Sequence, residues 1–368
     1  MKICIPRQEL LDAVNKVKTV VSPKSALPIL SHILMEADDA QLKMTATDLK
    51  VSIECTVDCT VKEAGSLTVS SQRLSSILAE LPDGEITLDL AGNNVINLEC
   101  GKIKTKLFSM SAEEFPPVRT FEGVEPVSIE QKLLRKMFQK TSFAVSTDQG
   151  RYNLTGLLFE LADGKLTVVA TDGRRMSLYA EREGIPKGLN RKVIIPGKMI
   201  MELERLLADN GEVELYLDEA QAAFQFDSLR LVTALIEGNF PNYDMVIPKK
   251  HDKEAILVTS TFMEAMRRTR TMTNDKFNSV RITVNGSVMK LNVVTPEVGE
   301  YEEELEVEFD GGNLDIAFNP DYVIEVLRRI ESEKLCLVLK DASSPGLIKP
   351  YEEKSSHQYL NVVMPIRL

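Results

Sequence analysis

Leu42-Lys-Met-Thr-Ala-Thr-Asp48 recurs 124 residues later as Leu166-Thr-Val-Val-Ala-Thr-Asp172. A weaker third copy, Leu291-Asn-Val-Val-Thr-Pro296, ends a further 124 residues along the chain. Three units of this length account for essentially all of the 368 residues. A period that divides a chain without remainder indicates repeated copies of one domain, so we expect three similar domains.

The structural signals follow the same order in each unit. A Phe-Pro or Met-Pro pair closes each one, at Phe115-Pro116, Phe240-Pro241 and Met364-Pro365. Stretches rich in Pro, Gly and acidic residues, at 116–126 and 242–254, are the expected linkers. We therefore predict domains at residues 1–122, 126–248 and 253–368.

Apolar residues at three- and four-residue spacing predict two amphipathic helices in each unit. The opening helices carry Leu10, Leu11, Val14 and Val17; Leu134, Met137 and Phe138; and Phe262, Met263 and Met266. The second helices carry Leu74, Ile77, Leu78 and Leu81; Ile200, Leu203, Leu206 and Leu207; and Val323, Ile324, Leu327 and Ile330. Strands follow each helix; the one at 156–161 runs into Asp163-Gly164, which is a hairpin signal. Each unit is therefore expected to be an α+β domain, with two helices packed on antiparallel sheets.

The composition is that of an ordinary globular protein, with 43% hydrophobic and 27% charged residues. The N-terminus carries charges where a secretion signal needs an apolar run, and no 18-residue apolar stretch occurs. Five scattered cysteines do not describe a disulfide framework, and Cys55-x3-Cys59 lacks a second ligand pair. We expect reduced thiols, no metal site and a cytoplasmic protein.

The charges are unevenly distributed. The net charge is −11, but the six expected helices carry 15 Lys and Arg against 9 Asp and Glu. The helices therefore total +6, and the rest of the chain carries −17. The expected helices are at residues 7–21, 72–81, 131–146, 197–208, 261–273 and 320–331. The strongest stripe combines Lys132, Lys136 and Lys140 with Arg135, and the third unit has Arg267, Arg268 and Arg270. Such stripes are either solvated faces or a helical surface that meets phosphates without reading bases.

Two segments carry opposite charge at strand spacing. Lys102, Lys104 and Lys106 alternate along a strand of the first unit, and residues 297–308 of the third unit contain seven glutamates. Complementary edges of this kind suit head-to-tail pairing between chains, which closes into a ring if the rotation permits. The alternative is that both are edge strands protected from aggregation by charge.

A search for catalytic chemistry finds little. The three histidines lie in no triad or metal spacing, and no Walker loop, G-x-G-x-x-G, G-x-S-x-G or H-E-x-x-H motif occurs. Asp48 and Asp172 occupy matching positions at strand ends, where aspartates commonly stabilise turns. Alternation spreads the glutamate run along one strand face, so it does not gather metal ligands. No enzymatic activity, metal or cofactor is therefore expected.

Several motifs are similar to those of the bacterial beta sliding clamp family, the processivity subunit of DNA polymerase III. They are Ala26-Leu-Pro-Ile-Leu30, Thr45-Ala-Thr-Asp-Leu49, Ala170-Thr-Asp-Gly-Arg-Arg175, Gly238-Asn-Phe-Pro-Asn-Tyr243, Asn274-Asp-Lys-Phe277-x3-Arg281 and Val362-Val-Met-Pro-Ile-Arg-Leu368. The resemblance covers the full length and implies a homodimeric, head-to-tail ring of six domains. Twelve helices would line this ring, which would encircle double-stranded DNA. The implied partners are the polymerase III catalytic subunit, the clamp loader, and other polymerases and repair proteins that carry short linear motifs.

The resemblance also implies site residues. DNA contacts would fall on Lys24, Arg73, Gln149, Tyr152 and Asn153. A pocket for partner peptides would comprise Leu154, Thr171, Gly173, Arg174, Arg175, Met176, Pro241, Met245, Val246, Pro345, Val362, Val363, Met364, Pro365, Ile366, Arg367 and Leu368. The dimer interface would comprise Lys102, Lys104, Lys106, Leu107, Thr271, Met272, Glu297, Glu300, Glu302 and Glu304.

The chain departs from the family pattern at four of these positions. Lys24 stands where an arginine is more familiar, and Asn153 replaces a second aromatic residue. Arg174 and Pro345 alter the pocket, so partner preferences do not carry over. Two other classes of protein stay open: a DNA-processing enzyme that uses the glutamate run, and a docking scaffold that never touches nucleic acid.

Overall fold

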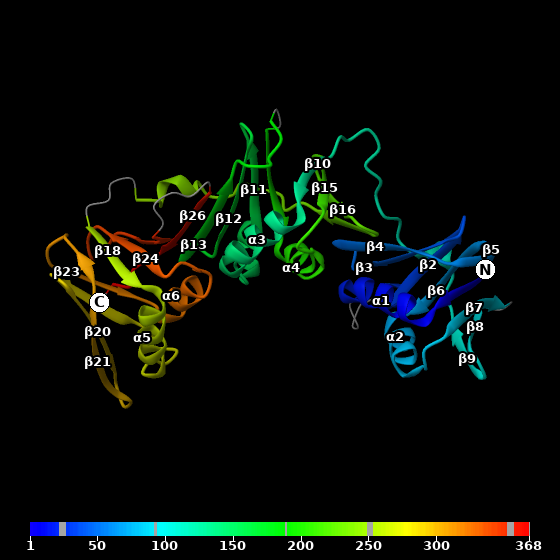
Figure 1. Cartoon of the computed structure of the whole chain (residues 1–368), viewed down its shortest axis with the longest axis horizontal. Helices are drawn as coiled ribbons and strands as arrows, with labels where there is room; N and C mark the ends of the chain where they lie inside the picture. Colours follow the sequence, from blue (N-terminus) through cyan, green and yellow to red (C-terminus); the bar gives the residue numbers. More distant parts are fainter. Residues whose placement is uncertain (22–26, 92–93, 188–189, 249–252, 352–356, 368) are drawn as a thin grey trace. The chain divides into compact units, whose positions relative to one another are not determined.

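The computed structural model describes residues 1–21, 27–91, 94–187, 190–248, 253–351 and 357–367. These residues form two units (Figure 1). Unit 1 contains Met1–Lys132 and Met201–Leu235, and unit 2 contains Leu133–Ile200 and Ile236–Leu368.

The described strands of unit 1 form one eight-stranded and one five-stranded sheet. The larger sheet has the order β10-β15-β16-β17-β4-β3-β2-β6, with bounds Val127–Glu130, Glu212–Leu217, Gln221–Phe226, Leu229–Ala234, Val51–Asp58, Gln41–Thr47, His32–Asp38 and Gly65–Ser70. The smaller sheet has the order β5-β1-β7-β8-β9, with bounds Thr60–Glu63, Lys2–Pro6, Glu85–Ala91, Val95–Cys100 and Ile103–Phe108. Helices α1 (Arg7–Val17) and α2 (Ser71–Glu80) pack against each other, and α1 also packs on β3 and β4.

The described strands of unit 2 form one nine-stranded and one four-stranded sheet. The larger sheet has the order β14-β11-β12-β13-β26-β25-β24-β18-β22, with bounds Arg191–Pro196, Gly156–Ala162, Lys165–Thr171, Arg175–Glu181, Gln358–Val363, Gly346–Pro350, Lys334–Leu339, Lys253–Val258 and Glu308–Phe309. The smaller sheet has the order β21-β20-β19-β23, with bounds Gly299–Glu306, Val288–Thr295, Val280–Asn285 and Leu314–Phe318. Helices α5 (Thr259–Thr271) and α6 (Pro320–Leu327) pack against each other. The unit boundaries cut helices α3 (Gln131–Thr141) and α4 (Gly197–Leu206).

Each large sheet joins strands from two successive thirds of the chain. At the first junction β4 pairs antiparallel with β17, with Cys55 opposite Leu229. At the second junction β13 pairs antiparallel with β26, with Tyr179 opposite Tyr359. The strands on either side follow in the same order in both sheets, so the two junctions are copies of one arrangement. The middle third contributes strands to both sheets, which explains why the unit boundaries cross it.

The two strands that carry the charged segments stand at sheet edges. β9 is the last strand of the five-stranded sheet, and β21 is the last strand of the four-stranded sheet. The sequence-based interpretation of the lysine and glutamate segments as edge strands is therefore confirmed for the residues that lie on β9 and β21.

The apolar faces of the helices are buried as the spacing predicts. Leu10, Val14 and Val17 of α1 are buried, as are Leu74 and Leu78 of α2. The hairpin at 163–164 is also confirmed, because Asp163 (φ 53°) and Gly164 (φ 65°) connect β11 to β12 in the left-handed region.

The helices end earlier than the apolar spacing predicts. α2 ends at Glu80, and Leu81 is already extended, with φ −73° and ψ 145°. Pro82 explains this end, because a proline disfavours helical backbone in the residue before it. α4 and α6 likewise end before Leu207 and Ile330.

The basic stripe predicted on α3 is wrong at Lys140. Lys140 is only 6% exposed, and its Nζ pairs with Glu331 at 2.7 Å and lies over the ring of Tyr359 at 5.6 Å. Helical spacing groups the lysines but does not reveal the glutamate and the tyrosine that pack on them from the last third. Two arginines of α5 are also paired, Arg268 with Glu303 and Arg270 with Asp321, but both side chains stay exposed, at 47% and 45%. Lys132 and Arg267 are exposed.

All five cysteines are free thiols, as the scattered spacing predicts. Burial raises the pKa of Cys336 to about 11, so this thiol stays protonated near neutral pH. Within the described ranges, no helix has the length and apolar character needed to cross a membrane.

Candidate functional site

A pocket of about 130 Å³ opens in unit 2 beside the second junction. Nine residues that the resemblance assigned to a peptide site line it: Leu154, Thr171, Gly173, Arg175, Met176, Pro241, Val246, Val362 and Met364. Most of these side chains are apolar. Beneath them lies the buried core of unit 2, to which Leu154, Met176 and Val362 also belong.

Three further lining residues escaped the sequence analysis: Phe240, Asn242 and Tyr243. They flank Pro241 within the motif Gly238-Asn-Phe-Pro-Asn-Tyr243, so the motif itself was the available signal. Tyr243 donates a hydrogen bond to Glu160 at 2.6 Å. Burial and this bond raise the pKa of Tyr243, so its hydroxyl stays protonated near neutral pH.

The other predicted pocket residues within the described ranges are not among those that line it: Arg174, Met245, Pro345, Val363, Pro365, Ile366 and Arg367. Val363 follows Val362 on β26, and successive side chains of a strand point to opposite faces. It packs instead in the interior, beside Phe262 and Phe318. Leu368 lies outside the described residues.

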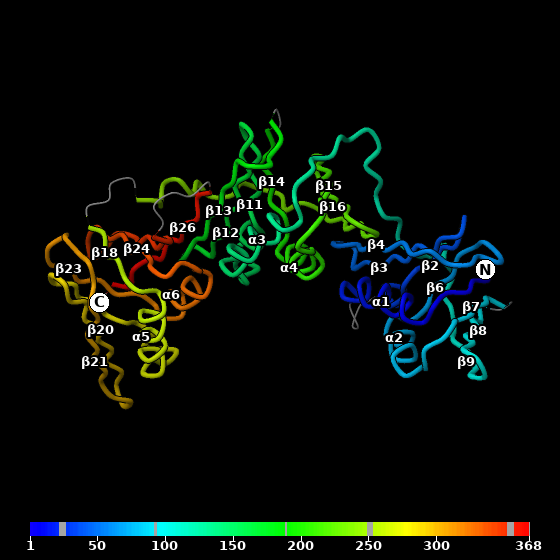
Figure 2. Tube along the Cα trace, viewed as in Figure 1, coloured from blue at the N-terminus to red at the C-terminus, as the bar shows by residue number. Residues whose placement is uncertain are grey.

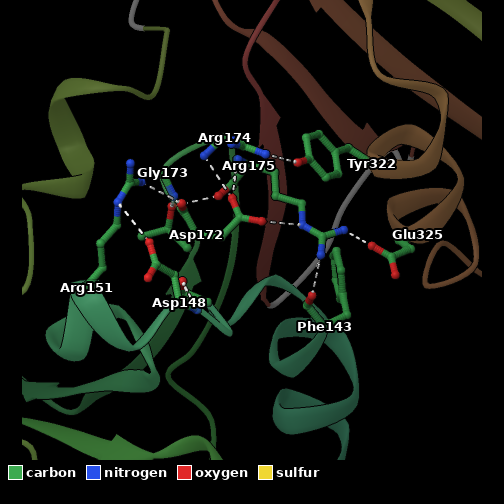
Figure 3. A network of polar contacts seen from close by, with 11 residues as sticks. Phe143, Asp148, Arg151, Asp172, Gly173, Arg174, Arg175, Tyr322 and Glu325 are labelled. Atoms are coloured by element: carbon green, nitrogen blue, oxygen red, sulfur yellow. Dashed lines mark hydrogen bonds and ion pairs between the residues drawn. The ribbon is translucent and has the colours of Figure 1, made fainter. Parts of the chain in front are cut away.

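One wall of the pocket is a turn built by Asp172 (Figure 3). Its Oδ1 accepts hydrogen bonds from the backbone N–H groups of Arg174 (2.8 Å) and Arg175 (3.0 Å). Asp48 holds the equivalent turn of unit 1, accepting from Lys50 at 2.9 Å and Val51 at 2.7 Å. The interpretation of both aspartates as turn residues is confirmed.

Arg175 is held in the pocket wall by contacts on every side. Its side chain is 10% exposed, its Nε donates to Asp172 Oδ2 at 3.1 Å, and its Nη2 donates to the carbonyl of Phe143 at 2.8 Å. The guanidinium also pairs with Glu325 and lies 4.9 Å from the ring centre of Tyr322, on α6 (Figure 3). Its charge is thus compensated inside the protein, and Arg175 ties the middle third to the last third.

Arg174 and Arg151 place two cations near this wall (Figure 3). Arg174 donates to the hydroxyl of Tyr322 at 3.2 Å, and this bond raises the pKa of Arg174. Arg151 donates to the carbonyl of Asp172 at 3.1 Å. Gly173 has φ 84°, in the left-handed region that favours glycine, and a Cβ there would meet the far end of the Arg151 side chain at 2.7 Å.

The C-terminal residues are fastened at two points. Met364 N–H donates to the carbonyl of Arg174, and Ile366 N–H donates to the carbonyl of Ala317, both at 2.8 Å. Met364 is 38% exposed at the pocket. Its backbone bond fixes this thioether beside the turn of Asp172.

The residues assigned to DNA contact lie on a helix and a loop. Arg73 is exposed in the first turn of α2, where Ser70 caps its N–H. Gln149, Tyr152 and Asn153 belong to the short 3-10 segment Gln149–Leu154; Tyr152 is 48% exposed, and Asn153 bonds to the carbonyl of Asn239. Lys24 lies outside the described residues.

The residues assigned to the dimer interface lie on or beside the two edge strands. Lys104, Lys106 and Leu107 are on β9, and Lys102 precedes it. Glu300, Glu302 and Glu304 are exposed on β21, and Glu297 lies in the turn before it. Thr271 ends α5, and Met272 follows, where its carbonyl accepts a hydrogen bond from the Thr295 hydroxyl at 2.6 Å.

In the part of the chain that the structure describes, no group of three or more His, Cys, Asp or Glu residues is arranged to hold a metal ion. On β21, Glu302 and Glu303 instead pair with Lys290 and Arg268.

Comparison with known proteins accounts for the whole chain. Family models of the DNA polymerase III beta subunit match residues 1–119 (N-terminal domain), 128–242 (central domain) and 244–367 (C-terminal domain). A beta sliding clamp of Chlamydia muridarum is 31% identical over 368 residues, covering 100% of this chain and 99% of the relative. The chain belongs to the beta sliding clamp family.

Solved members of the family have the same fold. The crystal structure of the DNA polymerase III subunit beta from Pseudomonas aeruginosa is 33% identical, with a TM-score of 0.94 and complete coverage of both chains. The DNA polymerase sliding clamp from Bacillus subtilis is 26% identical, with a TM-score of 0.96 over 100% of this chain and 99% of that one. The three similar domains predicted from the repeat and the clamp fold implied by the family resemblance are confirmed, while the domain boundaries given above stay a prediction.

The matched aspartates allow a test of the pocket wall. Replacing Asp172 with alanine should lower the free energy of unfolding by about 1–3 kcal/mol more than replacing Asp48, because Asp172 also pairs with the nearly buried Arg175. Residue 51, which stands where Arg175 does, is a valine. Urea titration followed by circular dichroism measures both variants. Equal losses in the two variants would show that the Arg175 pair adds nothing to stability.

Proposed function

We propose that this chain is a processivity clamp of DNA replication, which acts as a homodimeric ring around duplex DNA and tethers the replicative polymerase. The relatives and solved structures carry the name of DNA polymerase III beta clamps, which supports this role. The observation that carries the ring is the pair of strand edges, β9 and β21.

These two strands are the counterparts of the strands that pair at both junctions. β21 follows β20 as β4 follows β3 and β13 follows β12, and β9 follows β8 as β17 follows β16 and β26 follows β25. Within the described chain, β9 therefore lacks the partner strand that β17 and β26 have, and β21 lacks the partner strand that β4 and β13 have. Antiparallel pairing of β9 in one chain with β21 in another would repeat the junction a third time and, at both ends, close a head-to-tail dimer.

The register of the junctions carries over to this pairing. Cys55 opposite Leu229 and Tyr179 opposite Tyr359 correspond to Tyr301 opposite Ile103. One residue to either side, Glu300 then faces Lys104, and Glu302 faces Lys102. Three positions beyond Glu300, Glu297 faces Leu107, and Lys106 faces Val298 between them. Glu304 lies two residues beyond Glu302 on β21, and Thr271 and Met272 lie at the end of α5.

The first junction already contains the same charge pair within one chain. Glu54 and Arg230 occupy the positions of Glu300 and Lys104, and their side chains pair at 3.4 Å. This precedent supports the interpretation of the charged edges as an interface. Charge protection of a lone edge is the weaker alternative, because it would not require opposite signs at opposed positions.

Reversing Lys102, Lys104 and Lys106 to glutamate should convert the dimer to monomers of 41.1 kDa in sedimentation velocity. Exposed pairs contribute about 0.2–1 kcal/mol each, so single reversals should have small effects. Adding Glu300→Lys and Glu302→Lys to the triple variant should recover dimers. A charge-matched variant reversed at Lys62, Lys165 and Lys340 serves as the control and should stay dimeric. A triple variant that sediments unchanged would remove β9 from the interface.

Within this proposal the ring holds DNA by topology. The helices supply a few exposed cations, including Arg73, Lys132 and Arg267, which can meet phosphates without reading bases. Weak contacts suit sliding, because strong ones would halt it. The clamp has no enzymatic activity of its own in this proposal and acts in the cytoplasm at the nucleoid.

The wild-type clamp, once loaded, should be retained on closed circular DNA and lost when the circle is cut, because a linear duplex has ends. Replacing Arg73 and Lys24 with alanine should weaken loading and reduce the log–log salt slope by roughly 0.9 per lost phosphate contact. Lys62→Ala, which removes a charge from β5, is the control. Retention that survives cutting would favour a docking scaffold or direct binder. Magnesium-dependent cleavage of the circle would favour an enzyme.

We further propose that the pocket of unit 2 binds short extended peptides of the polymerase III catalytic subunit, the clamp loader, and other polymerases and repair proteins. Its apolar lining with a few polar groups at the rim suits one or two apolar anchors of an extended segment.

Deleting residues 364–368 should greatly weaken the binding of a peptide from the polymerase catalytic subunit. The cut removes Met364 from the pocket while β26, which ends at Val363, stays complete. A few buried anchors carry most of a peptide's binding energy, so a loss of tenfold or more is expected. Fluorescence anisotropy measures the affinity, and Arg367→Ala is the milder control. Undiminished binding to a truncated protein that is still dimeric would place the partner site elsewhere.

A further inference from the structure

The two junctions share the same strand pairing, but the surface beside the first is covered by a chain segment and the surface beside the second is an open pocket. At the first junction, Phe121 packs on Ala223 of β16 and Val232 of β17, with Val118, Val124 and Tyr216 packed beside it. Val118, Phe121 and Val124 belong to the segment 116–126, which has no helix or strand and appears in teal in Figure 2.

Strand register shows that Phe121 covers the counterpart of the pocket. Val232 lies opposite Ser52 as Val362 lies opposite Met176, and Val362 and Met176 both line the pocket. Ala223 is next to Val232 in the position of Leu347, which lies in the core beneath the pocket.

The loops beside the two surfaces also match. Thr47 Oγ1 accepts from the N–H of Leu49 at 3.0 Å, as Thr171 Oγ1 accepts from the N–H of Gly173 at the same distance. Leu49 keeps the left-handed backbone of Gly173, with φ 74° against 84°. A leucine pays for that conformation with strain, so the turn is maintained against local preference.

The covering residues differ in burial. Phe121 follows Phe115-Pro116 at the distance at which Val246 follows Phe240-Pro241. Phe121 is 9% exposed, whereas Val246 is 37% exposed at the rim of the pocket. Phe121 therefore covers the surface at the first junction, whereas Val246 leaves the matching pocket at the second junction open.

The segment is held as a docked peptide would be. Its aromatic anchor lies 6.1 Å from the ring of Tyr216 and 5.8 Å from the guanidinium of Arg230. Polar contacts flank the anchor: Arg119 pairs with Asp218 at 3.0 Å, and its carbonyl accepts from Arg230 at 3.3 Å. One apolar anchor with polar contacts around it is the usual energetic pattern of peptide recognition.

We propose that the first junction is a second peptide groove, which residues 117–126 of the same chain close in cis. Its ligand class is a short extended peptide with an aromatic anchor. The inference rests on the proposed peptide site at the second junction, with which it shares its strand positions and loop.

The probe is a fluorescein-labelled peptide with the sequence of residues 117–126, Pro-Val-Arg-Thr-Phe-Glu-Gly-Val-Glu-Pro. In the wild-type protein the tethered copy outcompetes it, because a short tether gives an effective concentration in the millimolar range. Phe121→Ala with Val124→Ala should loosen the tethered segment. The variant should then bind the probe at least about tenfold more tightly than the wild type, at one site per chain.

Controls separate this outcome from the second pocket. Met245→Ala with Val246→Ala alters the second linker at the position that matches Phe121 and at its neighbour, and it should leave probe binding as in the wild type. Both variants are also made without residues 364–368, so that a failed partner-peptide site does not affect the readout. A dimeric variant with native circular dichroism that binds the probe no better than the wild type would overturn the proposal, as would a probe in which alanine replaces phenylalanine binding equally well. If the double alanine variant does not fold, Phe121→Leu gives the same comparison with a smaller cavity.

Discussion

The structure depends on one backbone interaction, the antiparallel pairing of β4 with β17 and of β13 with β26. Among the described strands, each third of the chain contributes one strand of each kind: β9 and β4, then β17 and β13, then β26 and β21. The two strands of one third do not pair with each other. The large sheets exist because successive thirds complete each other's hydrogen-bond ladders. The division of the middle third between two units, the position of the pocket and the free edges of β9 and β21 all follow from this pairing.

Much of this fold was predictable from local signals in the sequence. The 124-residue period, the helical spacing around Leu10 and Leu74, and the turn at Asp163-Gly164 each depend on neighbouring residues only. Strand alternation likewise identified the charged edges. Lys140 was misjudged because its environment comes from Glu331 and Tyr359, which lie 191 and 219 residues further along the chain, and no periodicity encodes such a contact.

The candidate site was predictable in part, and for a different reason. Its apolar lining came from a family resemblance and not from pattern, since Leu154, Met176 and Val362 look like ordinary core residues in the sequence. Phe240 and Tyr243 were missed because the sequence of the motif around Pro241 does not show which of its side chains face the pocket. The role of Arg175 could not be predicted from the sequence, because its charge is compensated in the folded protein by Asp172 and by Glu325 of the last third.

The sheets are continuous across the junctions. The number of chains in an assembly and the strength of their association therefore depend on different features of the structure. In a ladder of backbone hydrogen bonds, the angle between neighbouring strands is set by sheet twist, which side-chain charge hardly changes. If β9 and β21 pair as the internal junctions do, the rotation from one chain to the next copies an angle already used twice within each chain. Charges at Lys104 and Glu300 would then tune how long a ring stays closed, while its size is inherited from the fold.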